Sequence, residues 1–564
     1  MTAHPAKAHA IDVIIVGSGA GGSMAAYVLT KAGLNCLLLE AGRDYDPVKE
    51  VNMFATSDMA PLRDTATPEK PFGFFDATID GGWQVPGEPY TTAPGTTFKW
   101  WRTRMLGGRT NHWARHVPRF GPYDFKGFSR DGQGVDWPIA YEDIAPWYDR
   151  TEKLIGVYGV NAGLENHPNS SPGVLMPPPK ARIHELLIQA AAADLGIPVV
   201  PTRTAILTRD MPDDHAPRQA CFYATPCGRG CSIGAAFQTT TSLLPMARAT
   251  GHLTTVTGAM VARVNLSRPG RAAGVTYIDK ATGQTHDVTA RAVVLAASAC
   301  ETARLLLNSS NMANSSGQVG RNLMDTVGAS VEAHVDGLEG RPAYNEEGAN
   351  MPHMYAPFWL YKEQAAGQLD FHRGYHFEIG GGFGLPGPWN EDVTPAYGPG
   401  FKAAYRRTRG CSLHMTLRGE MIPNPGSFCE LDPTVRDKFG IPVLRFSWAW
   451  TANELNMVQH ATDTARAVLT RAGGRVTTPA KTPQEAISAG GEIIHEVGTC
   501  RMGADPKSSV TDAYGRTWDV DNLMLADGSV MASQPHKNPT LTILALSWRN
   551  SERLAQRLKT GGFA

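Results

Sequence analysis

Short apolar runs alternate with helical apolar patterns in the first forty residues of the chain. Residues 11–16 (IDVIIV) form a β-branched run that ends at a glycine, which is typical of a buried parallel strand. Residues 23–33 (SMAAYVLTKAG) follow with a helical pattern, and residues 36–40 (CLLLE) form a second apolar run. This order of strand, glycine turn, helix and strand predicts the start of a doubly wound α/β domain.

Three distant segments continue the same alternation. Residues 292–308 (AVVLAASACETARLLLN) predict a strand, a small-residue turn and a helix, and residues 522–529 (NLMLADGS) predict a strand that ends at a polar turn. Residues 540–558 carry an apolar-periodic pattern that predicts a closing helix. The predicted fold class is therefore α/β, with a sheet assembled from segments far apart in the sequence.

The first glycine turn has the composition of a dinucleotide-binding loop. Gly17, Gly19 and Gly22 lie in GSGAGG, where glycines let the backbone approach a pyrophosphate at a helix N-terminus. Glu40 ends the second strand, where a carboxylate accepts from ribose hydroxyls and repels a 2′-phosphate. The alternative is glycine packing without a ligand, but strand, turn, helix, strand and acid all occur in order. At this point both NAD and FAD fit the pattern.

Charge and composition exclude several classes of partner. The 564 residues include 53 basic and 53 acidic residues, so nucleic acid and anionic membrane surfaces are poor partners and neutral small molecules fit better. Charges interrupt the apolar runs before a spanning length, which predicts no transmembrane segment. The first ten residues (MTAHPAKAHA) lack a separate apolar stretch with a cleavage site, so we expect no signal peptide in this chain.

Several motifs together resemble one family of flavoproteins. Residues 106–113 (LGGRTNHW) give a glycine turn with polar and aromatic residues suited to an isoalloxazine ring, and 319–325 read VGRNLMD. With GSGAGG and the segments at 292–308 and 522–529, they resemble the glucose–methanol–choline (GMC) family of FAD oxidoreductases. LGGRTNHW, ACFYATPCGRGC, HEVGTCRMG and PHKNPTLT make the chain similar to bacterial sugar dehydrogenases, in particular the catalytic subunits of glucoside 3-dehydrogenases. Gluconate, fructose and FAD-linked glucose dehydrogenases and pyranose oxidases are the nearest rivals.

The resemblance implies a two-domain organisation. We expect a discontinuous, Rossmann-type FAD-binding domain at 1–156, 236–330 and 490–564, and a substrate-binding domain on an antiparallel sheet at 331–489. Residues 157–235 are expected to form a surface insertion with a cysteine loop. FAD is expected to be noncovalent, with a bond to His112 as the alternative. Beside Gly17, Gly19, Gly22 and Glu40, the cofactor-binding residues implied are Gly108, Asn111, His112, Trp113, Val261, Asp527 and Thr540.

The resemblance also implies a catalytic pair. His495 in HEVGTCRMG matches the active-site histidine of the family, and a neutral imidazole accepts a hydroxyl proton near pH 7. Asn538 in HKNPTLT matches the second member; its amide orients a hydroxyl but is no base, and a helix-cap role is the alternative. His536 is interpreted as a neighbour of the site.

The predicted substrate domain carries polar and aromatic residues that suit a sugar. Aromatic faces fit the C–H side of a pyranose and polar tips fit its hydroxyls, but an ordinary sheet core explains each residue singly as well. The candidates are His353, Tyr355, Trp359, Tyr361, His372, Tyr375 and His376, with Glu420 of lower rank.

Three cysteines lie close together in the sequence. Cys221, Cys227 and Cys231 have a C-x5-C-x3-C spacing, and the resemblance implies a three-iron, four-sulfur (3Fe-4S) cluster, which needs three cysteines. Unliganded thiols are the alternative, and a structural zinc would want a fourth ligand. A cluster would pass electrons to a cytochrome or other acceptor. A sugar oxidase using oxygen and a non-catalytic flavin electron-transfer subunit are the rival functions, and an NAD-dependent enzyme is a further one.

The resemblance also implies which partners this chain has and in which compartment it works. Relatives of this kind are carried to the periplasm by a small subunit that bears the export signal. We therefore expect either co-export to the periplasm with such a partner or a cytoplasmic enzyme. The expected substrate is a sugar or glycoside whose secondary hydroxyl, at position 3 by resemblance alone, becomes a ketone.

Overall fold

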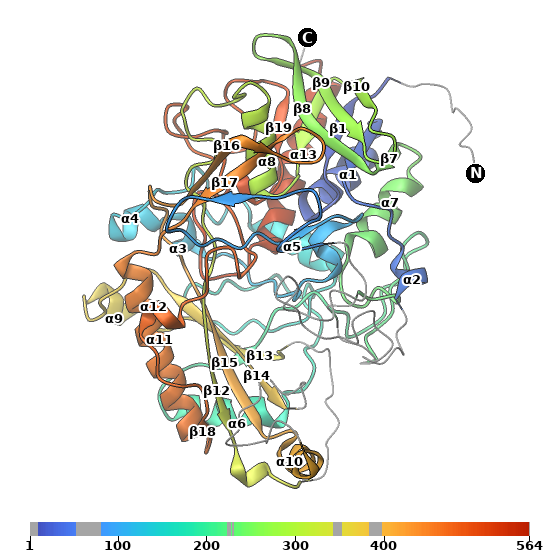
Figure 1. The fold of residues 1–564 in the computed structure, drawn as a ribbon. Helices are drawn as coiled ribbons and strands as arrows, with labels where there is room; N and C mark the ends of the chain where they lie inside the picture. Colours follow the sequence, from blue (N-terminus) through green and yellow to red (C-terminus); the bar gives the residue numbers. More distant parts are fainter. Residues whose placement is uncertain are drawn as a thin grey trace.

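The computed structural model describes residues 10–51, 81–222, 227, 230–341, 352–382 and 398–562. Its upper part in Figure 1 is built on a five-stranded parallel sheet. The strand order is β19 (Leu523–Leu525), β11 (Ala292–Leu295), β1 (Val13–Val16), β2 (Cys36–Glu40) and β7 (Leu253–Thr257). All side chains of the four strands from β19 to β2 are buried, which explains why their sequences are apolar without alternation.

Two helices pack together beside this sheet. α1 (Ala20–Lys31) begins inside the glycine turn, earlier than the predicted helix, and it contacts α13 (Thr540–Lys559). The hydroxyl of Ser547 in α13 donates to the carbonyl of Gly21, 2.7 Å away. Such close contact is possible because α1 presents small residues to its neighbours. The last helix of the chain therefore lies against the first.

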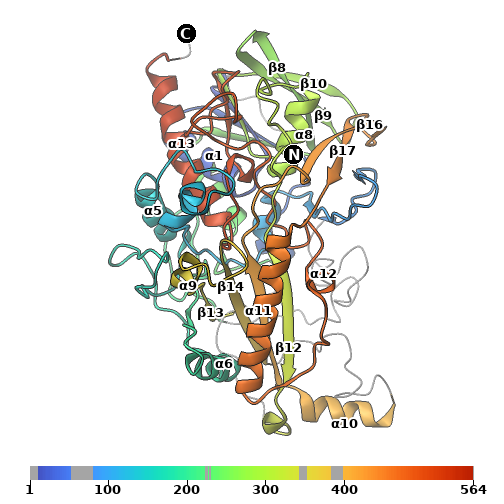
Figure 2. The ribbon, with the colours of Figure 1, turned by 90° about the vertical axis from the view of Figure 1, so that its left-hand side faces the viewer.

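The lower part in Figure 1 is a six-stranded sheet whose pairings are all antiparallel. Its order is β18 (Arg475–Val476), β12 (Val327–His334), β15 (Ser412–Gly419), β14 (Tyr375–Gly382), β13 (Met354–Ala356) and β6 (Val200–Pro201). In β15 buried and less buried residues alternate, as expected for a sheet with one covered face. α11 (Ala452–Arg471) runs along this sheet in Figure 2 and contacts β12 and β15. An α/β fold with a parallel and an antiparallel sheet was predicted, and this is confirmed.

Smaller sheets and helices complete the described chain. β8 (Ala259–Arg268), β9 (Arg271–Asp279) and β10 (Thr285–Thr289) form a meander. β16 (Phe428–Arg436) pairs with β17 (Pro442–Ser447), which also pairs with β4 (Thr91–Thr92), and β3 (Gly81–Gly82) pairs with β5 (Arg102–Thr103). The other α-helices are α2 (Pro47–Glu50), α3 (Pro122–Phe125), α4 (Gly127–Asp131), α5 (Ala145–Ile155), α6 (Ile183–Ala193), α7 (Leu243–Ala249), α8 (Ala299–Asn308), α9 (Tyr361–Ala365), α10 (Pro399–Thr408) and α12 (Pro483–Ala486).

The segment 157–235 differs from the expected surface insertion. Its strand β6 pairs with β13 at the edge of the six-stranded sheet, and its helix α6 contacts β14 and α11. The reason is that one face of α6, with Ile188, Ala191 and Ala192, is apolar and buried. The domain boundaries themselves stay a prediction.

Within the described residues, no helix is both long and apolar enough to cross a membrane.

Candidate active site

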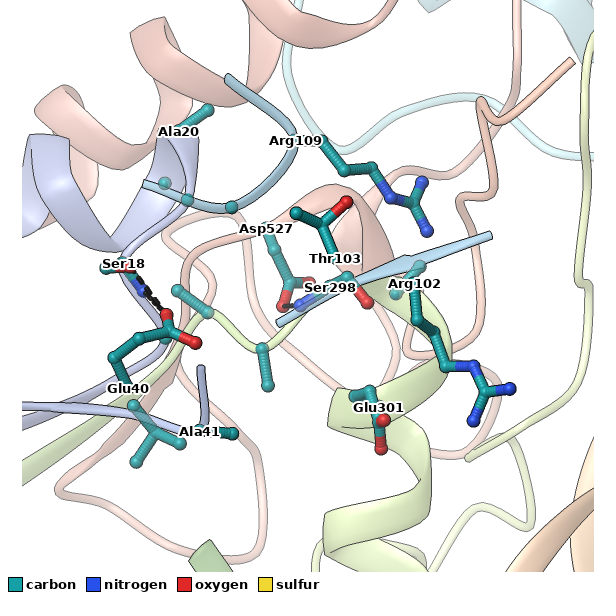
Figure 3. A pocket seen from close by; sticks show the side chains of 18 of the residues that line it. Ser18, Ala20, Glu40, Ala41, Arg102, Thr103, Arg109, Ser298, Glu301 and Asp527 are labelled. Carbon is teal, nitrogen blue, oxygen red and sulfur yellow. Dashed lines mark hydrogen bonds between the residues drawn. The ribbon is translucent and has the colours of Figure 1, made fainter. Parts of the chain in front are cut away.

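A cavity lies at the carboxyl ends of the parallel strands. Its lining includes Gly17 after β1, Glu40 at the end of β2, Ala296 after β11 and Asp527 after β19. Ligands of open α/β sheets bind at this edge, because the loops there diverge to leave a crevice. The lining continues through Arg109 (Figure 3). His495 also belongs to it, so segments from both ends of the chain meet in one cavity.

The glycine turn leaves room for a phosphate group. A Cβ atom on Gly19 would have no protein atom within 4 Å, and one on Gly108 would approach only Gly19, with its Cα atom at 3.6 Å. Gly19 is the N-cap of α1, and no side chain caps that helix or puts an acid in its first turn. The free N–H groups and the helix dipole favour an anion here. These residues therefore fit the pyrophosphate of FAD.

Gly17 and Gly22 have a different role. A Cβ on Gly17 would lie 2.4 Å from the carbonyl oxygen of Ala296, and one on Gly22 would lie 1.9 Å from that of Gly17. Both glycines therefore let backbones approach closely. Gly17 also lines the cavity, whereas Gly22 is not among the lining residues described.

Glu40 is held in place at the cavity wall. Its carboxylate accepts hydrogen bonds from the N–H of Ser18 at 3.0 Å, the hydroxyl of Ser18 at 2.5 Å and the N–H of Gly42 at 2.7 Å (Figure 3). The Ser18 hydroxyl in turn accepts from the N–H of Gly107 at 2.8 Å. Val261 in β8 lies along the same cavity. A fixed carboxylate at the end of β2 fits the ribose of a dinucleotide.

Asp527 and Thr540 line the cavity on its C-terminal side. The Asp527 carboxylate accepts from the N–H of Ser298 at 3.1 Å and from the hydroxyl of Thr302 at 2.6 Å (Figure 3). Thr540 is the first residue of α13, which has no side-chain cap and no acid in its first turn. A second helix N-terminus therefore faces the cavity and favours negative charge on a bound cofactor.

His495 lies half-buried in the cavity wall. Its Nδ1 atom is 2.9 Å from the hydroxyl oxygen of Thr326, at the start of β12. Burial lowers the pKa of His495 to about 3, and the nearby Arg418 guanidinium acts in the same direction. The imidazole is consequently neutral at neutral pH, which is the form that accepts a proton.

Asn538 belongs to a polar group beside His495. Its Nδ2 atom lies 3.4 Å from a carboxylate oxygen of Glu378 in β14, while its buried Oδ1 has no hydrogen-bond partner in the described chain. Glu378 forms ion pairs with Arg418 at 3.1 Å and with His116 at 3.2 Å. Although burial raises the pKa of Glu378, Arg418 and His116 lower it well below its usual value. The site thus combines a neutral base, an amide oxygen and a fixed carboxylate.

Asn111 and His112 were predicted to bind the cofactor, but the structure places neither among the described lining residues. The Asn111 side chain donates to the carbonyl of Leu106 at 2.8 Å and so shapes the glycine turn. The Nε2 atom of His112 lies 2.8 Å from the hydroxyl of Thr103. Trp113, the next residue, does line the cavity. This arrangement favours a noncovalent cofactor.

Most of the substrate-domain candidates have structural contacts. The hydroxyl of Tyr375 lies 2.9 Å from His460 Nδ1, Asn166 donates to the hydroxyl of Tyr361 at 3.2 Å, and His353 Nδ1 lies 2.8 Å from the carbonyl of Lys180. Tyr355 contacts His167, Trp359 packs edge-on against Tyr375, and His372 is exposed. Only His376, 3.8 Å from Glu378, joins the polar group near His495 among these seven.

His536 and Glu420 are both buried, and the structure places them outside the lining described for the cavity. Both ring nitrogens of His536 are buried without a partner in the described chain, and burial lowers its pKa well below the usual value. Burial raises the pKa of Glu420 to about 7, although Arg373 at 3.1 Å opposes this shift. Neither residue lines the cavity in the described part of the chain.

The three cysteines gather against one small apolar cluster. Cys227 and Cys231 are buried in it with Tyr158, Met176 and Ile206, and Cys221 packs against it. Residues 223–226 and 228–229, between these cysteines, lie outside the described residues. Among the described residues, the possible metal-ligand atoms of His334, Asp336 and Glu339 all lie within 4.8 Å of one another. The three cysteines do not form such a group in the described part of the chain.

Two buried guanidinium groups accompany the cysteines. Arg115 is fully buried and donates to the carbonyls of Cys227 at 2.8 Å and of Asn111 at 2.9 Å. Burial lowers the pKa of Arg115, and the thiols of Cys227 and Cys231 act in the opposite direction. Burial likewise lowers the pKa of Arg218, and the nearby thiol of Cys231 acts in the opposite direction. Within the described residues, both guanidinium groups donate to backbone carbonyls, and no carboxylate pairs with either arginine.

Several residues of the site were missed by sequence reasoning. Asp325 and Thr326 hold the segment and the ring of His495, and the motif that ends at Asp325 could have indicated this. Glu378 and Arg418 come from neighbouring strands of the antiparallel sheet and form an ion pair. Charged residues at interior-facing strand positions are the sequence signal that could have indicated them. Arg109 lies in LGGRTNHW and forms an ion pair with Glu496 beside His495.

Comparisons with known proteins agree with this geometry. Two family models described as GMC oxidoreductase match residues 12–327 and 423–547. A 2-methyl-1,2-propanediol dehydrogenase from Mycolicibacterium austroafricanum is 30% identical over 97% of this chain and 95% of its own length. A fructose dehydrogenase large subunit from Gluconobacter japonicus is 28% identical over 98% of each chain. The crystal structure of a pyridoxine 4-oxidase from Mesorbium loti superposes with a TM-score of 0.64 at 18% identity, covering 96% of this chain and 99% of that one.

Proposed function

The chain belongs to the GMC oxidoreductase family, and on this premise we propose that it is an FAD-dependent sugar dehydrogenase. The proposed reaction oxidises a secondary hydroxyl of a pyranose or glycoside to a ketone, at ring position 3. The position rests on the motif resemblance. The main support for the reaction is the half-buried, neutral imidazole of His495 in the wall of the cofactor cavity.

The chain's own groups fit this reaction. The glycine cradle at Gly19, the Glu40 carboxylate and the N-terminus of α13 would hold FAD, which supplies the acceptor for a hydride when bound. Thr326 occupies Nδ1 of His495, so Nε2 is the atom that takes the hydroxyl proton. The Oδ1 of Asn538, which has no hydrogen-bond partner among the described residues, would accept a hydrogen bond from substrate and orient it.

A polar substrate is favoured by the groups beside the base. Arg418 holds the pKa of the Glu378 carboxyl well below its usual value, and the ion pair of the two side chains offers acceptors and donors for sugar hydroxyls. Because their charges cancel, the pair suits a neutral polyol better than a net anion or cation. One relative is named for a diol and another for fructose, in agreement with a neutral hydroxyl compound.

We also propose that Cys221, Cys227 and Cys231 hold a 3Fe-4S cluster. Support comes from the shared apolar cluster and from the buried guanidinium groups of Arg115 and Arg218 beside it, with which no carboxylate pairs in the described part of the chain. Arg115 further connects the cysteine loop to Thr110 and Asn111, next to the cofactor cavity. Such a cluster would pass electrons singly to a cytochrome or similar acceptor. A relative named as a large subunit agrees with a small partner subunit, and co-export with it would place the enzyme in the periplasm.

Anaerobic absorption spectroscopy of the purified holoenzyme tests the proposal. Addition of a simple glucoside should bleach the flavin bands, and NMR of the product should show a carbonyl at ring position 3. Rapid peroxide formation in air would instead indicate an oxidase. Flavin bands that no sugar bleaches would refute the sugar substrate and point to another alcohol or to a non-catalytic role.

A further inference from the structure

The residue before the proposed base has an unfavourable backbone conformation. Ile494 has a φ of +66°, in the left-handed region, although its side chain is β-branched. The branched Cβ crowds the backbone there, so this conformation lowers the population of such a residue by a factor of roughly five to a hundred. Ile494 also lines the cofactor cavity next to His495. The orientation of the His495 backbone therefore depends on a strained residue.

Asp325 fixes the chain on both sides of this residue. Its fully buried carboxylate accepts the N–H of Ile493 at 3.2 Å and the N–H of His495 at 2.9 Å. The adjacent residue Met324 pairs with Val497 through backbone hydrogen bonds of 3.0 and 3.1 Å. The five residues from Ile493 to Val497 are thus bracketed by contacts with one short segment. The same segment supplies Thr326, which contacts the imidazole itself.

Arg109 fixes the loop from the opposite direction. Its guanidinium donates to the carbonyl of Ile494 at 3.2 Å and forms an ion pair with Glu496. The peptide group after Ile494 is consequently held from both sides, through its carbonyl by Arg109 and through the N–H of His495 by Asp325, while the N–H of Ile494 donates to the carbonyl of Gly491 at 3.1 Å. Strained conformations persist only where surrounding contacts determine them in this way.

We propose that Asp325, with Arg109, holds Ile494 in its left-handed conformation and thereby positions the His495 imidazole toward the substrate hydroxyl. The inference rests on the proposed role of His495 as the base. Asp325 is a positioning residue, because it contacts the backbone of the loop and not the reacting atoms. Without it, the loop relaxes toward ordinary backbone angles and His495 leaves its working position for most of the time.

A double-mutant cycle between Asp325 and Ile494 tests this directly. Asp325→Asn keeps the volume but replaces one acceptor oxygen by an NH₂ group, so the two N–H groups cannot both be satisfied. We expect flavin bleaching by the glucoside to slow at least fivefold in the holoenzyme, with KM changed less than twofold. Adding Ile494→Gly should restore most of the lost rate, because glycine adopts a positive φ without the clamp.

The matched control is Asp512→Asn. Asp512 also accepts two backbone N–H groups, those of Tyr514 at 2.8 Å and Arg516 at 3.1 Å, but on a turn that lines no part of the cofactor cavity. Its bleaching rate should equal that of the wild type. Equal rates for wild type and Asp325→Asn, or no recovery with Ile494→Gly, would overturn the inference. A wild-type enzyme that no sugar reduces would instead refute the proposed function.

A second measurement applies even where Asp325→Asn does not fold. Ile494→Ala and Ile494→Gly remove nearly the same packing, but alanine still has a Cβ that disfavours a positive φ. The glycine variant should therefore melt at the same temperature as the alanine variant or higher. An alanine variant that is clearly the more stable of the two would show that the position is not strained.

Discussion

The hydroxyl oxygen of Thr326 lies 2.9 Å from the Nδ1 atom of His495, although 169 residues separate them in the sequence. This contact fixes the rotation of the imidazole ring and occupies one of its two nitrogens. In the proposed reaction, the other nitrogen, Nε2, takes the proton of the substrate hydroxyl. A base oriented in this way contributes to catalysis only through the geometry that the two segments share.

Loss of the imidazole should remove the chemical step. We expect His495→Ala to slow flavin bleaching by glucoside about a hundredfold to ten-thousandfold, the range typical of a general base. FAD content, measured by absorption after denaturation, should not change. The exposed His372 provides the control, because His372→Ala should leave the rate unaltered. An unaltered rate in His495→Ala would exclude its role as base.

The Glu378 carboxylate should be needed in its charged form. Glu378→Gln removes the partner of Arg418 and the charged acceptor of Asn538, and such hydrogen bonds contribute about 1.5–3 kcal/mol. A fall of roughly tenfold to a hundredfold in kcat/KM is therefore expected from steady-state kinetics. Glu332→Gln, at an exposed position of β12, should behave as wild type. Equal kcat/KM values for both variants would contradict the assignment.

A side chain at Gly19 should expel the cofactor without harming the fold. The Cβ of Gly19→Ala meets no protein atom within 4 Å, but it projects into the cradle proposed for the pyrophosphate. We expect at least tenfold weaker FAD binding in fluorescence titrations, with an unchanged melting temperature of the apoprotein. Gly400→Ala, also free of contacts within 4 Å, should retain normal affinity. Normal affinity in Gly19→Ala would place the pyrophosphate elsewhere.

The stability of the enzyme should depend on pH through Asp325. Burial raises the pKa of this carboxyl from 3.8 to about 7, and Glu496 adds to the effect. The folded protein binds the Asp325 proton more tightly than the unfolded chain does. The contribution of this carboxyl to the free energy of unfolding is therefore fully present below pH 3.8 and is lost as the pH rises through 7. The melting temperature of the wild type should therefore fall relative to Asp325→Asn between pH 5 and pH 8. The free-energy difference is at most about 4 kcal/mol, and a difference that is constant with pH would contradict the shift.

Iron should depend on the three clustered cysteines. Cys227→Ser should lower the iron and acid-labile sulfide content and abolish the corresponding electron paramagnetic resonance signal, because serine is a poor ligand for this cluster. Bleaching of the flavin by sugar should persist, while reduction of a one-electron acceptor should slow. Cys411→Ser, a buried cysteine outside the cluster, is the control. Wild-type protein purified anaerobically without iron would refute the cluster.

The sequence by itself predicted four of the five strands of the parallel sheet and several residues that line the cavity at its edge. The apolar runs at 11–16, 36–40, 292–295 and 522–525 correspond to buried strands, since a strand covered on both faces must be apolar throughout. Gly19 and Glu40 were found because glycine freedom and a strand-end carboxylate have local sequence signals. The family motifs likewise placed His495 in the cavity wall.

Tertiary structure alone decided which distant groups meet around the base. Glu378 lies against Asn538 across 160 residues, and Asp325 against the backbone of His495 across 170. Asn111 turned out to shape a turn, and strand β6 joined the antiparallel sheet from a segment expected at the surface. The periodicity of apolar residues indicates which face of an element is buried, because burial depends on each residue's own polarity. It does not indicate which element covers that face, because the packing of the whole chain determines this.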